Sequence, residues 1–240
     1  MSSPLEVMRP REFGDLPYRM YVPEETPRTL ILFLHGAGER GTDNQKQIAY
    51  NNQFLHRYIN SAYAKTHPAI VLAPQCPERR EDGIEEKWVY KPWGEGTFYG
   101  LKEESFPLKA VVELCKEVIE KYHLDASHSI VTGISMGGFG TWDLISRHPG
   151  MFYKAVPICG GGSTKQEDVE RIVKSGVQIW TFHGDADDIV PVSGTRDMVN
   201  AIRKAGGIVK YTEYKDIMHG SWGPAYEEEE LLSWLFDFSV

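Results

Sequence analysis

Short runs of apolar residues alternate with helically periodic segments along most of the 240-residue chain. The runs at 29–34 (TLILFL) and 69–73 (AIVLA) are continuously apolar apart from Thr29, which is typical of parallel strands buried on both faces. From Leu108 onward, apolar residues recur at the spacing of a helix with one buried face. This alternation predicts an α/β fold, a mostly parallel central sheet flanked by helices.

The same patterns predict the remaining elements. An early strand at 18–22 is expected to pair antiparallel near the N-terminus. We expect further strands at 129–132, 154–158, 178–182 and 208–214, and helices at 136–148, 193–205 and 227–236. The stretch 74–107 lacks clear periodicity, and a loop of that length is usually functional or mobile. With no internal repeat or low-complexity linker, we expect a single domain over 1–240 that carries one insertion at about 74–107.

Charge and composition exclude several classes of partner. The net charge is −8 and the isoelectric point near 5.5, without a long run of Lys and Arg, so nucleic acids and anionic membranes are not expected partners. The first residues lack the basic and apolar regions of a signal peptide, and no apolar stretch is long enough to span a membrane. The three widely spaced cysteines form no disulfide framework or metal pattern. We therefore expect a cytoplasmic protein without cofactors, although a secreted protein that had lost its signal peptide would have the same sequence.

A candidate nucleophile lies at Ser135. The run Gly133-Ile134-Ser135-Met136-Gly137 fits the G-x-S-x-G pattern and lies between a predicted strand and a predicted helix. The chemistry requires a tight turn that projects the serine hydroxyl above the sheet, and its glycines avoid collisions with the flanking elements. The sequence therefore predicts a serine hydrolase.

The general base should follow the serine, because triads in this fold have the chain order Ser, Asp or Glu, His. His148 is at the end of a predicted helix, and His183 comes too early to follow an acid. His219 comes just after the last predicted strand, where a loop can bring it over Ser135. His219 is therefore the predicted base.

The acid should lie in the loop after the 178–182 strand. Asp185, Asp187 and Asp188 all occur there, and the pattern of residues does not choose among them. One of them is expected to orient the imidazole and stabilise the imidazolium. The cluster lacks the glycine and distal glutamate of a calcium loop, so no metal site is predicted.

Two backbone amides are candidates for an oxyanion hole. One belongs to Met136, the residue after the nucleophile, and the other should come from the loop after the 29–34 strand. That loop, at 35–41, contains three glycines that let its amides turn inward. Ala37 is the candidate donor.

These segments together resemble a known family. The segments at 34–41, 133–138, 183–191 and 218–220 are similar to the phospholipase/carboxylesterase branch of the α/β-hydrolases, and most of all to its predicted peptidases and to relatives of feruloyl esterases and polyhydroxybutyrate depolymerases. The resemblance covers roughly residue 18 to the C-terminus. It implies that Asp187, in a His-Gly-x-x-Asp pattern, is the acid and that Ala37 is an oxyanion donor. The sequence departs from the thioesterases of this branch in the 74–107 insertion and in Met136, where those enzymes often have Gln.

The insertion is rich in aromatic residues that are separated by glycines. They either line the substrate pocket or pack a small core beneath the loop, and the sequence does not decide between these alternatives. Trp222, close to His219, and the charged residues of the 35–41 loop are further candidates. The candidate substrate-binding residues are Trp88, Trp93, Trp222, Glu39 and Arg40.

The leading hypothesis is a serine carboxylesterase that hydrolyses short-chain or aromatic acyl esters, including acyl groups linked to carbohydrate, through an acyl-enzyme on Ser135. A serine peptidase on the same triad is an alternative, because acyl-transfer chemistry does not distinguish esters from amides. A non-catalytic binding module on a hydrolase fold is the third hypothesis.

Overall fold

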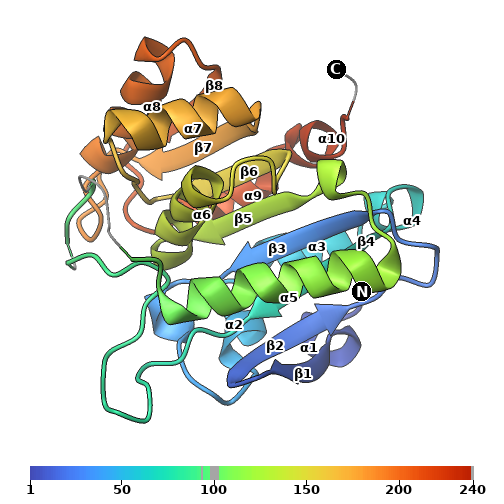
Figure 1. The fold of residues 1–240 in the computed structure, drawn as a ribbon. Coiled ribbons are helices and arrows are strands. Elements are labelled where there is room, and N and C mark those ends of the chain that lie inside the picture. Colours follow the sequence, from blue (N-terminus) through green and yellow to red (C-terminus); the bar gives the residue numbers. More distant parts are fainter. Residues whose placement is uncertain (93, 98–102, 239–240) are drawn as a thin grey trace.

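The computed structural model of the chain describes residues 1–92, 94–97 and 103–238. Its centre is an eight-stranded sheet with the strand order β1-β2-β4-β3-β5-β6-β7-β8 (Figure 1). β2 pairs antiparallel with β1 and β4, and all other neighbours are parallel. The strands are β1 Arg9–Phe13, β2 Leu16–Tyr21, β3 Thr29–Leu34, β4 Ala69–Pro74, β5 Ile130–Ile134, β6 Lys154–Ile158, β7 Gln178–Gly184 and β8 Val209–Tyr214.

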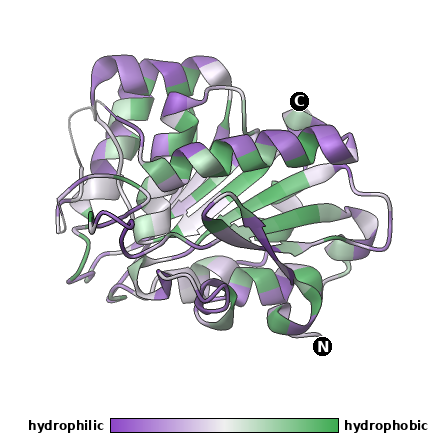
Figure 2. Ribbon diagram, turned by 60° about the horizontal axis from the view of Figure 1, so that its bottom comes forward, coloured by the Kyte–Doolittle hydropathy of each residue, from purple (hydrophilic) through white to green (hydrophobic). Residues whose placement is uncertain are grey.

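Helices cover both faces of the sheet. One buried cluster joins the sheet to α5, α6, α7 and α8, and a second joins its other face to α2, α3, α4, α9 and α10. Figure 2 shows the central strands in hydrophobic colours and the outer sides of the helices in hydrophilic ones. The helices are α1 Pro4–Val7, α2 Lys46–Ala49, α3 Gln53–Ile59, α4 Tyr63–Thr66, α5 Phe106–Tyr122, α6 Met136–Arg147, α7 Gln166–Ser175, α8 Ser193–Lys204, α9 Trp222–Glu227 and α10 Leu231–Leu235, with short 3-10 helices η1 Ala37–Glu39 and η2 Ala126–His128.

The predicted fold class is confirmed, and the main differences from the predicted elements are missed strands and helices and one divided helix. β1 gave no strand signal because its sequence, RPREF, is polar and mostly exposed at the sheet edge. The amphipathic helix α7 was missed because few of its residues are apolar, and α2, α3 and α4 are short. The expected closing helix at 227–236 is two helices, α9 and α10, separated at 228–230.

The insertion begins after β4 and ends at the start of α5. Its backbone passes closely over two glycines: a Cβ on Gly161 would lie 1.8 Å from the carbonyl oxygen of Gly96, and one on Gly194 would lie 2.5 Å from it. These contacts hold the insertion against the loop after β6 and the first turn of α8. Within the described parts of the chain, no helix has the length and hydrophobicity needed to cross a membrane.

Candidate active site

Ser135 stands in a strained turn between β5 and α6. Its backbone has φ 52° and ψ −115°, a region that non-glycine residues rarely adopt. A Cβ on Gly133 would lie 2.3 Å from the carbonyl oxygen of Gly137, and one on Gly137 would lie 2.0 Å from that of Leu34. Both positions therefore require glycine, as the G-x-S-x-G pattern predicts, and the turn presents the Ser135 hydroxyl at the carboxyl end of the sheet.

A continuous set of hydrogen bonds connects three side chains from distant segments. His219 Nε2 lies 2.9 Å from Ser135 Oγ, and His219 Nδ1 lies 2.8 Å from Asp187 Oδ2. The Asp187 side chain is fully buried, whereas that of His219 is 19% exposed. Burial alone would raise the pKa of Asp187, but hydrogen bonds from His183, His219 and the amides of Val190 and Ile189 lower it well below its usual range. Asp187 is therefore ionised where it faces the imidazole.

The structure separates the three aspartates of the 185–188 cluster. Only Asp187 of these three has hydrogen bonds to His219. Asp185 instead accepts a hydrogen bond from the amide of Asp216, and Asp188 is exposed. Among the other histidines, His148 pairs with Glu104 at the end of α6, as its position predicts.

Ala37 and Met136 line the same cavity as Ser135. Met136 is the first residue of α6, so its amide N–H has no acceptor within the helix. Ala37 is the first residue of η1, and its carbonyl oxygen accepts a hydrogen bond from Arg40 Nε at 3.1 Å. The structure thus places both predicted oxyanion donors beside the serine, and their role stays a prediction.

The loop that contains Ala37 is supported from beneath by the insertion. His35 Nδ1 donates to the carbonyl oxygen of Gly36, and its Nε2 accepts from the amide of Cys76. Burial lowers the pKa of His35 to about 4, which keeps this tautomer neutral. The indole N–H of Trp88 donates to the His35 carbonyl oxygen at 3.0 Å. Two residues of the insertion therefore fix the backbone of the candidate oxyanion loop.

The cavity above Ser135 has a volume of about 370 Å³. Of the predicted substrate-binding residues, Trp222 and Glu39 line this cavity, and the Trp222 ring meets His219 edge-on at 5.3 Å between ring centroids. Its lining residues are Gly36, Ala37, Gly38, Glu39, Asn51, Lys87, Val89, Lys91, Gly94, Ile134, Ser135, Met136, Phe139, Ile189, Val190, His219 and Trp222.

Two of the predicted substrate-binding residues lie elsewhere. Trp88 is fully buried beneath the oxyanion loop and packs on His35 rather than lining the cavity. Arg40 turns away from the cavity to Glu85 and to the carbonyl oxygen of Glu86. Neither residue lies where it was predicted, because both side chains support the loop at 35–41, which lines the cavity. Trp93, like Phe98 and Tyr99, lies outside the described residues.

The prediction missed three polar residues of the cavity, Asn51, Lys87 and Lys91, and the contacts of Asn51 and Lys91 show how they are held. Asn51 donates from Nδ2 to Glu39 Oε1 at 2.6 Å, which holds this buried carboxylate in the cavity wall. Lys91 is only 7% exposed; its ammonium donates to the carbonyl oxygen of Pro92 and lies 4.1 Å from the ring centroid of Phe139. Burial lowers the pKa of Lys91 to about 8. Neither residue belongs to a recognisable motif, so only the fold could reveal it.

Cys159, Asp187 and His219 have ligand atoms within 4.8 Å of one another. Burial raises the pKa of the Cys159 thiol far above its usual range, and a metal ligand must be a thiolate. His219 Nδ1 and Asp187 are already bonded to each other. The donor chemistry of this group therefore does not fit a resident cation.

A mostly parallel sheet flanked by helices, with a serine on a strained strand-to-helix turn, defines the α/β-hydrolase fold, and its site is of the serine-hydrolase type. The model of the dienelactone hydrolase family matches residues 95–229, more than half of the chain. The chain belongs to the dienelactone hydrolase family.

Solved and curated relatives agree with this assignment. A thermostable esterase is 35% identical, with a TM-score of 0.82 over 98% of this chain and 64% of that one. A ferulic acid esterase has a TM-score of 0.64 at 15% identity over 96% of this chain and 98% of its own, which shows the shared fold alone. Poly(3-hydroxyalkanoate) depolymerase C of Paucimonas lemoignei is 27% identical over 150 residues, 62% of this chain. The chain spans 32% of the depolymerase and less than two thirds of the thermostable esterase. The resemblance to α/β-hydrolases is confirmed.

Proposed function

We propose that this protein is a carboxylesterase that forms an acyl-enzyme on Ser135 and acts on short-chain or aromatic acyl esters. The observation that carries the proposal is the hydrogen-bonded series from Ser135 through His219 to Asp187, at the base of a cavity lined by two candidate oxyanion amides. The similarity to a thermostable esterase at 35% identity supports the same class of reaction.

In the acylation step, Ser135 Oγ attacks the ester carbonyl carbon while His219 Nε2 takes the hydroxyl proton. Asp187 holds the Nδ1–H tautomer and stabilises the resulting imidazolium. The carbonyl electrons move to an oxyanion that the Met136 and Ala37 amides stabilise. His219 then gives its proton to the alcohol oxygen as the carbon–oxygen bond breaks, which leaves the acyl-enzyme.

Deacylation repeats these roles with water. His219 takes a proton from water as its oxygen attacks the acyl carbon, and then returns the proton to Ser135 Oγ as the carboxylic acid leaves. The His219 side chain remains 19% exposed, so water can reach its Nε2 from the cavity.

The cavity supports an acyl group of limited size. Its volume of about 370 Å³ is at the lower end of the range for small-molecule sites. Phe139, Val89 and Trp222 supply apolar surface that suits a short alkyl chain or an aromatic ring. On another part of the wall, Glu39, held by Asn51, presents a carboxylate that can accept hydrogen bonds from substrate hydroxyls. This polar group supports the carbohydrate-linked esters within the proposed class.

The test is a panel of substrates assayed with the wild-type protein and with Ser135→Ala. The panel contains p-nitrophenyl acetate, butyrate and octanoate, methyl ferulate, acetylated xylan and peptide anilides. We expect turnover of acetate, butyrate and ferulate, weaker turnover of octanoate, and loss of roughly 10⁴-fold or more in kcat in the variant.

The outcomes distinguish the competing functions. Peptide anilides that are cleaved faster than every ester would identify a peptidase and overturn the proposal. Ester turnover that survives in Ser135→Ala would show that the serine is not the nucleophile. A wild-type protein without turnover of any substrate, although folded, would favour a binding module.

A further inference from the structure

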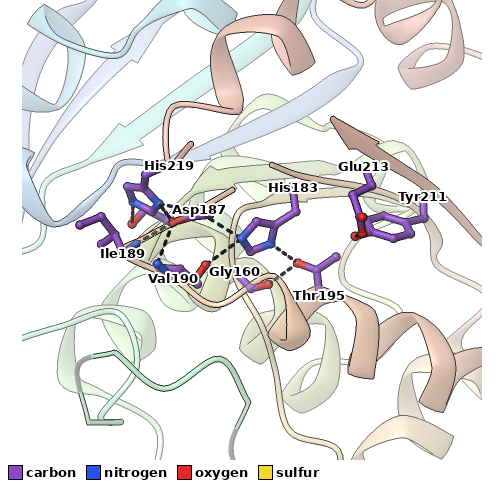
Figure 3. Close-up of polar contacts among 10 residues, drawn as sticks. Gly160, His183, Asp187, Ile189, Val190, Thr195, Tyr211, Glu213 and His219 are labelled. Atoms are coloured by element: carbon purple, nitrogen blue, oxygen red, sulfur yellow. Dashed lines mark hydrogen bonds and ion pairs between the residues drawn. The ribbon is translucent and has the colours of Figure 1, made fainter. Parts of the chain in front are cut away.

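A second buried histidine contacts the carboxylate that orients His219. His183 is fully buried near the end of β7, and its Nε2 lies 3.0 Å from Asp187 Oδ2. The same carboxylate oxygen lies 2.8 Å from His219 Nδ1. Figure 3 shows Asp187 between the two imidazole rings. His183 does not line the cavity, and its contact with the triad is through Asp187.

The hydrogen-bond partners of His183 indicate whether Nε2, the nitrogen that faces Asp187, carries a proton. Nε2 lies within hydrogen-bond distance of two oxygens that can only accept, Asp187 Oδ2 and the carbonyl oxygen of Val190 at 3.1 Å. On the opposite side, Nδ1 lies 2.7 Å from Thr195 Oγ1, which donates its only proton to the carbonyl oxygen of Gly160 and therefore accepts a hydrogen bond from Nδ1. A bare Nε2 lone pair would face two oxygens in a buried site, which is costly. Nε2 therefore carries a proton and donates it toward Asp187.

Thr195 fixes the ring from the other side. Its hydroxyl lies 2.6 Å from the carbonyl oxygen of Gly160, in the loop after β6. His183 thereby connects the acid loop at 184–190 to the first turn of α8 and to the loop after β6 (Figure 3). The ring lacks the freedom to rotate without breaking a buried hydrogen bond on each side.

We propose that His183 is a positioning residue that sets the place and the acceptor strength of Asp187, and through Asp187 the basicity of His219. This inference rests on the proposed function. Asp187 Oδ1 accepts the amides of Ile189 and Val190, so His183 supplies the side-chain donor that shares Oδ2 with His219. The two hydrogen bonds to Oδ2 hold the carboxylate in one position. The hydrogen bond from His183 also lowers the negative charge that the carboxylate presents to the His219 imidazolium.

Removal of the His183 donor has two expected consequences. The Asp187 carboxylate loses one of its fixed contacts, so kcat should fall roughly 10- to 100-fold while KM for p-nitrophenyl acetate changes less than about twofold. The remaining negative charge then stabilises the His219 imidazolium more strongly. The acid limb of the kcat/KM profile should therefore move to higher pH by about half a unit to one unit.

Three ionisable groups near the two rings, Glu213, Cys159 and Lys91, do not titrate in the window of this acid limb. Glu213 on β8 pairs in register with His183, and hydrogen bonds from Arg196 on α8 and from Tyr211, working against its burial, hold its pKa at about 2. Cys159 beneath His219 is neutral because burial raises its thiol pKa. Lys91 in the cavity has a pKa lowered to about 8, so the alkaline limb is not used.

The experiment compares kcat, KM and pH–rate profiles of His183→Leu, His183→Gln and Thr195→Val with those of the wild-type protein. Gln keeps a donor and should restore most of kcat and the wild-type acid limb. Thr195→Val removes the partner of Nδ1 and should shift the acid limb in the same direction as His183→Leu, by less. Thr195→Ser, which keeps the hydroxyl, should behave as wild type.

Thr181→Val is the matched structural control. Thr181 is another fully buried polar residue of β7, and its hydroxyl donates to the Pro157 carbonyl oxygen, away from Asp187. This variant should lose stability without a shift of the acid limb.

The proposal is overturned if His183→Leu, folded as judged by circular dichroism, keeps the wild-type kcat and acid limb, or if it changes no more than Thr181→Val. If His183→Leu does not fold, an unshifted acid limb in Thr195→Val overturns it. A wild-type protein that turns over no ester would contradict the proposed function instead, so the two failures are distinguishable.

Discussion

The elbow around Ser135 and the insertion, which lies between the end of β4 at Pro74 and the start of α5 at Phe106, both contribute to the same cavity, but they do so by different means. The elbow is encoded in a short stretch of sequence: two required glycines and a strained serine lie within five consecutive residues. The insertion has only one isolated β-bridge in its described part, Arg79 with Glu85, and depends on contacts with distant segments. Its tryptophan at 88 and the amide of Cys76 support the oxyanion loop across the fold. The elbow therefore places the proposed nucleophile, whereas the insertion supplies and supports groups around the cavity.

The largest expected effect is at Asp187, the proposed acid, which orients His219 toward the elbow serine. Asp187→Asn should lower kcat by about 10⁴-fold, because an amide in this position favours the wrong tautomer of His219. Asp188→Asn is the matched control, since Asp188 is exposed in the same loop, and it should change kcat less than about twofold. Steady-state kinetics with p-nitrophenyl acetate measure both. A larger loss in Asp188→Asn would show that the triad is misassigned.

The contrast between the regions also explains what could be predicted from sequence. Ser135 and its glycines were predictable because their pattern spans five consecutive residues, and His219 because the fold imposes a chain order. Asp187 needed the resemblance to a family, since three aspartates share one loop. The positions of Trp88 and Arg40 were predicted wrongly because an aromatic or charged residue in a loop carries no signal of which way it turns.

The contacts of His183 could not be predicted from the sequence either. Chain order set it apart from the predicted base, but its contacts with Asp187 and Val190 in the following loop and with Thr195 in α8 are seen only in the folded chain. Asn51 and Lys91 enter the cavity from the segment before α3 and from the insertion, for the same reason.

The role of the insertion as a support is testable at Trp88. Trp88→Phe keeps a buried ring and removes the N–H that bonds the His35 carbonyl oxygen, so the oxyanion loop should loosen and kcat should fall roughly tenfold with KM unchanged. Trp142→Phe is the control, because the Trp142 ring is also buried but its indole nitrogen has no hydrogen-bond partner in the described part of the chain. Equal kcat values in the two variants would remove the proposed link between insertion and oxyanion loop.

His35 should make the same support sensitive to acid. Its folded pKa, about 4, is below its unfolded value of 6.5, so the unfolded chain takes up a proton first. The contribution of neutral His35 is therefore complete above pH 6.5 and is lost as the pH falls toward 4. Over this window the loss in free energy of unfolding should be on the order of 3 kcal/mol.

Urea unfolding of the wild-type protein and His35→Gln between pH 7 and pH 4 measures this loss. The free energy of unfolding should fall more steeply with decreasing pH in the wild-type protein than in the variant. Asp143 acts in the opposite sense, because burial raises its pKa to about 6 and its contribution falls as the pH rises through that range. Asp143 is present in both proteins, so their difference isolates His35. If the free energies of unfolding of the two proteins fall in parallel between pH 7 and pH 4, buried His35 is not neutral as proposed.

The smallest expected effect concerns the cavity wall contributed by Trp222. Trp222→Ala should raise KM for methyl ferulate by about 2- to 10-fold, as expected for loss of an aromatic contact, and should change KM for p-nitrophenyl acetate less. Trp234→Ala is the control, because Trp234 is also half-buried but does not line this cavity. A uniform change for both substrates would mean that Trp222 does not select the acyl group.

The account depends above all on Ser135 as an activated nucleophile. The most direct measurement is intact-mass spectrometry and peptide mapping after incubation with a fluorophosphonate, in the wild-type protein and in Ser135→Ala. A single adduct on Ser135, absent from the variant and slowed strongly in Asp187→Asn, is the predicted result. A wild-type protein that stays unlabelled, or that is labelled at another residue, would contradict it.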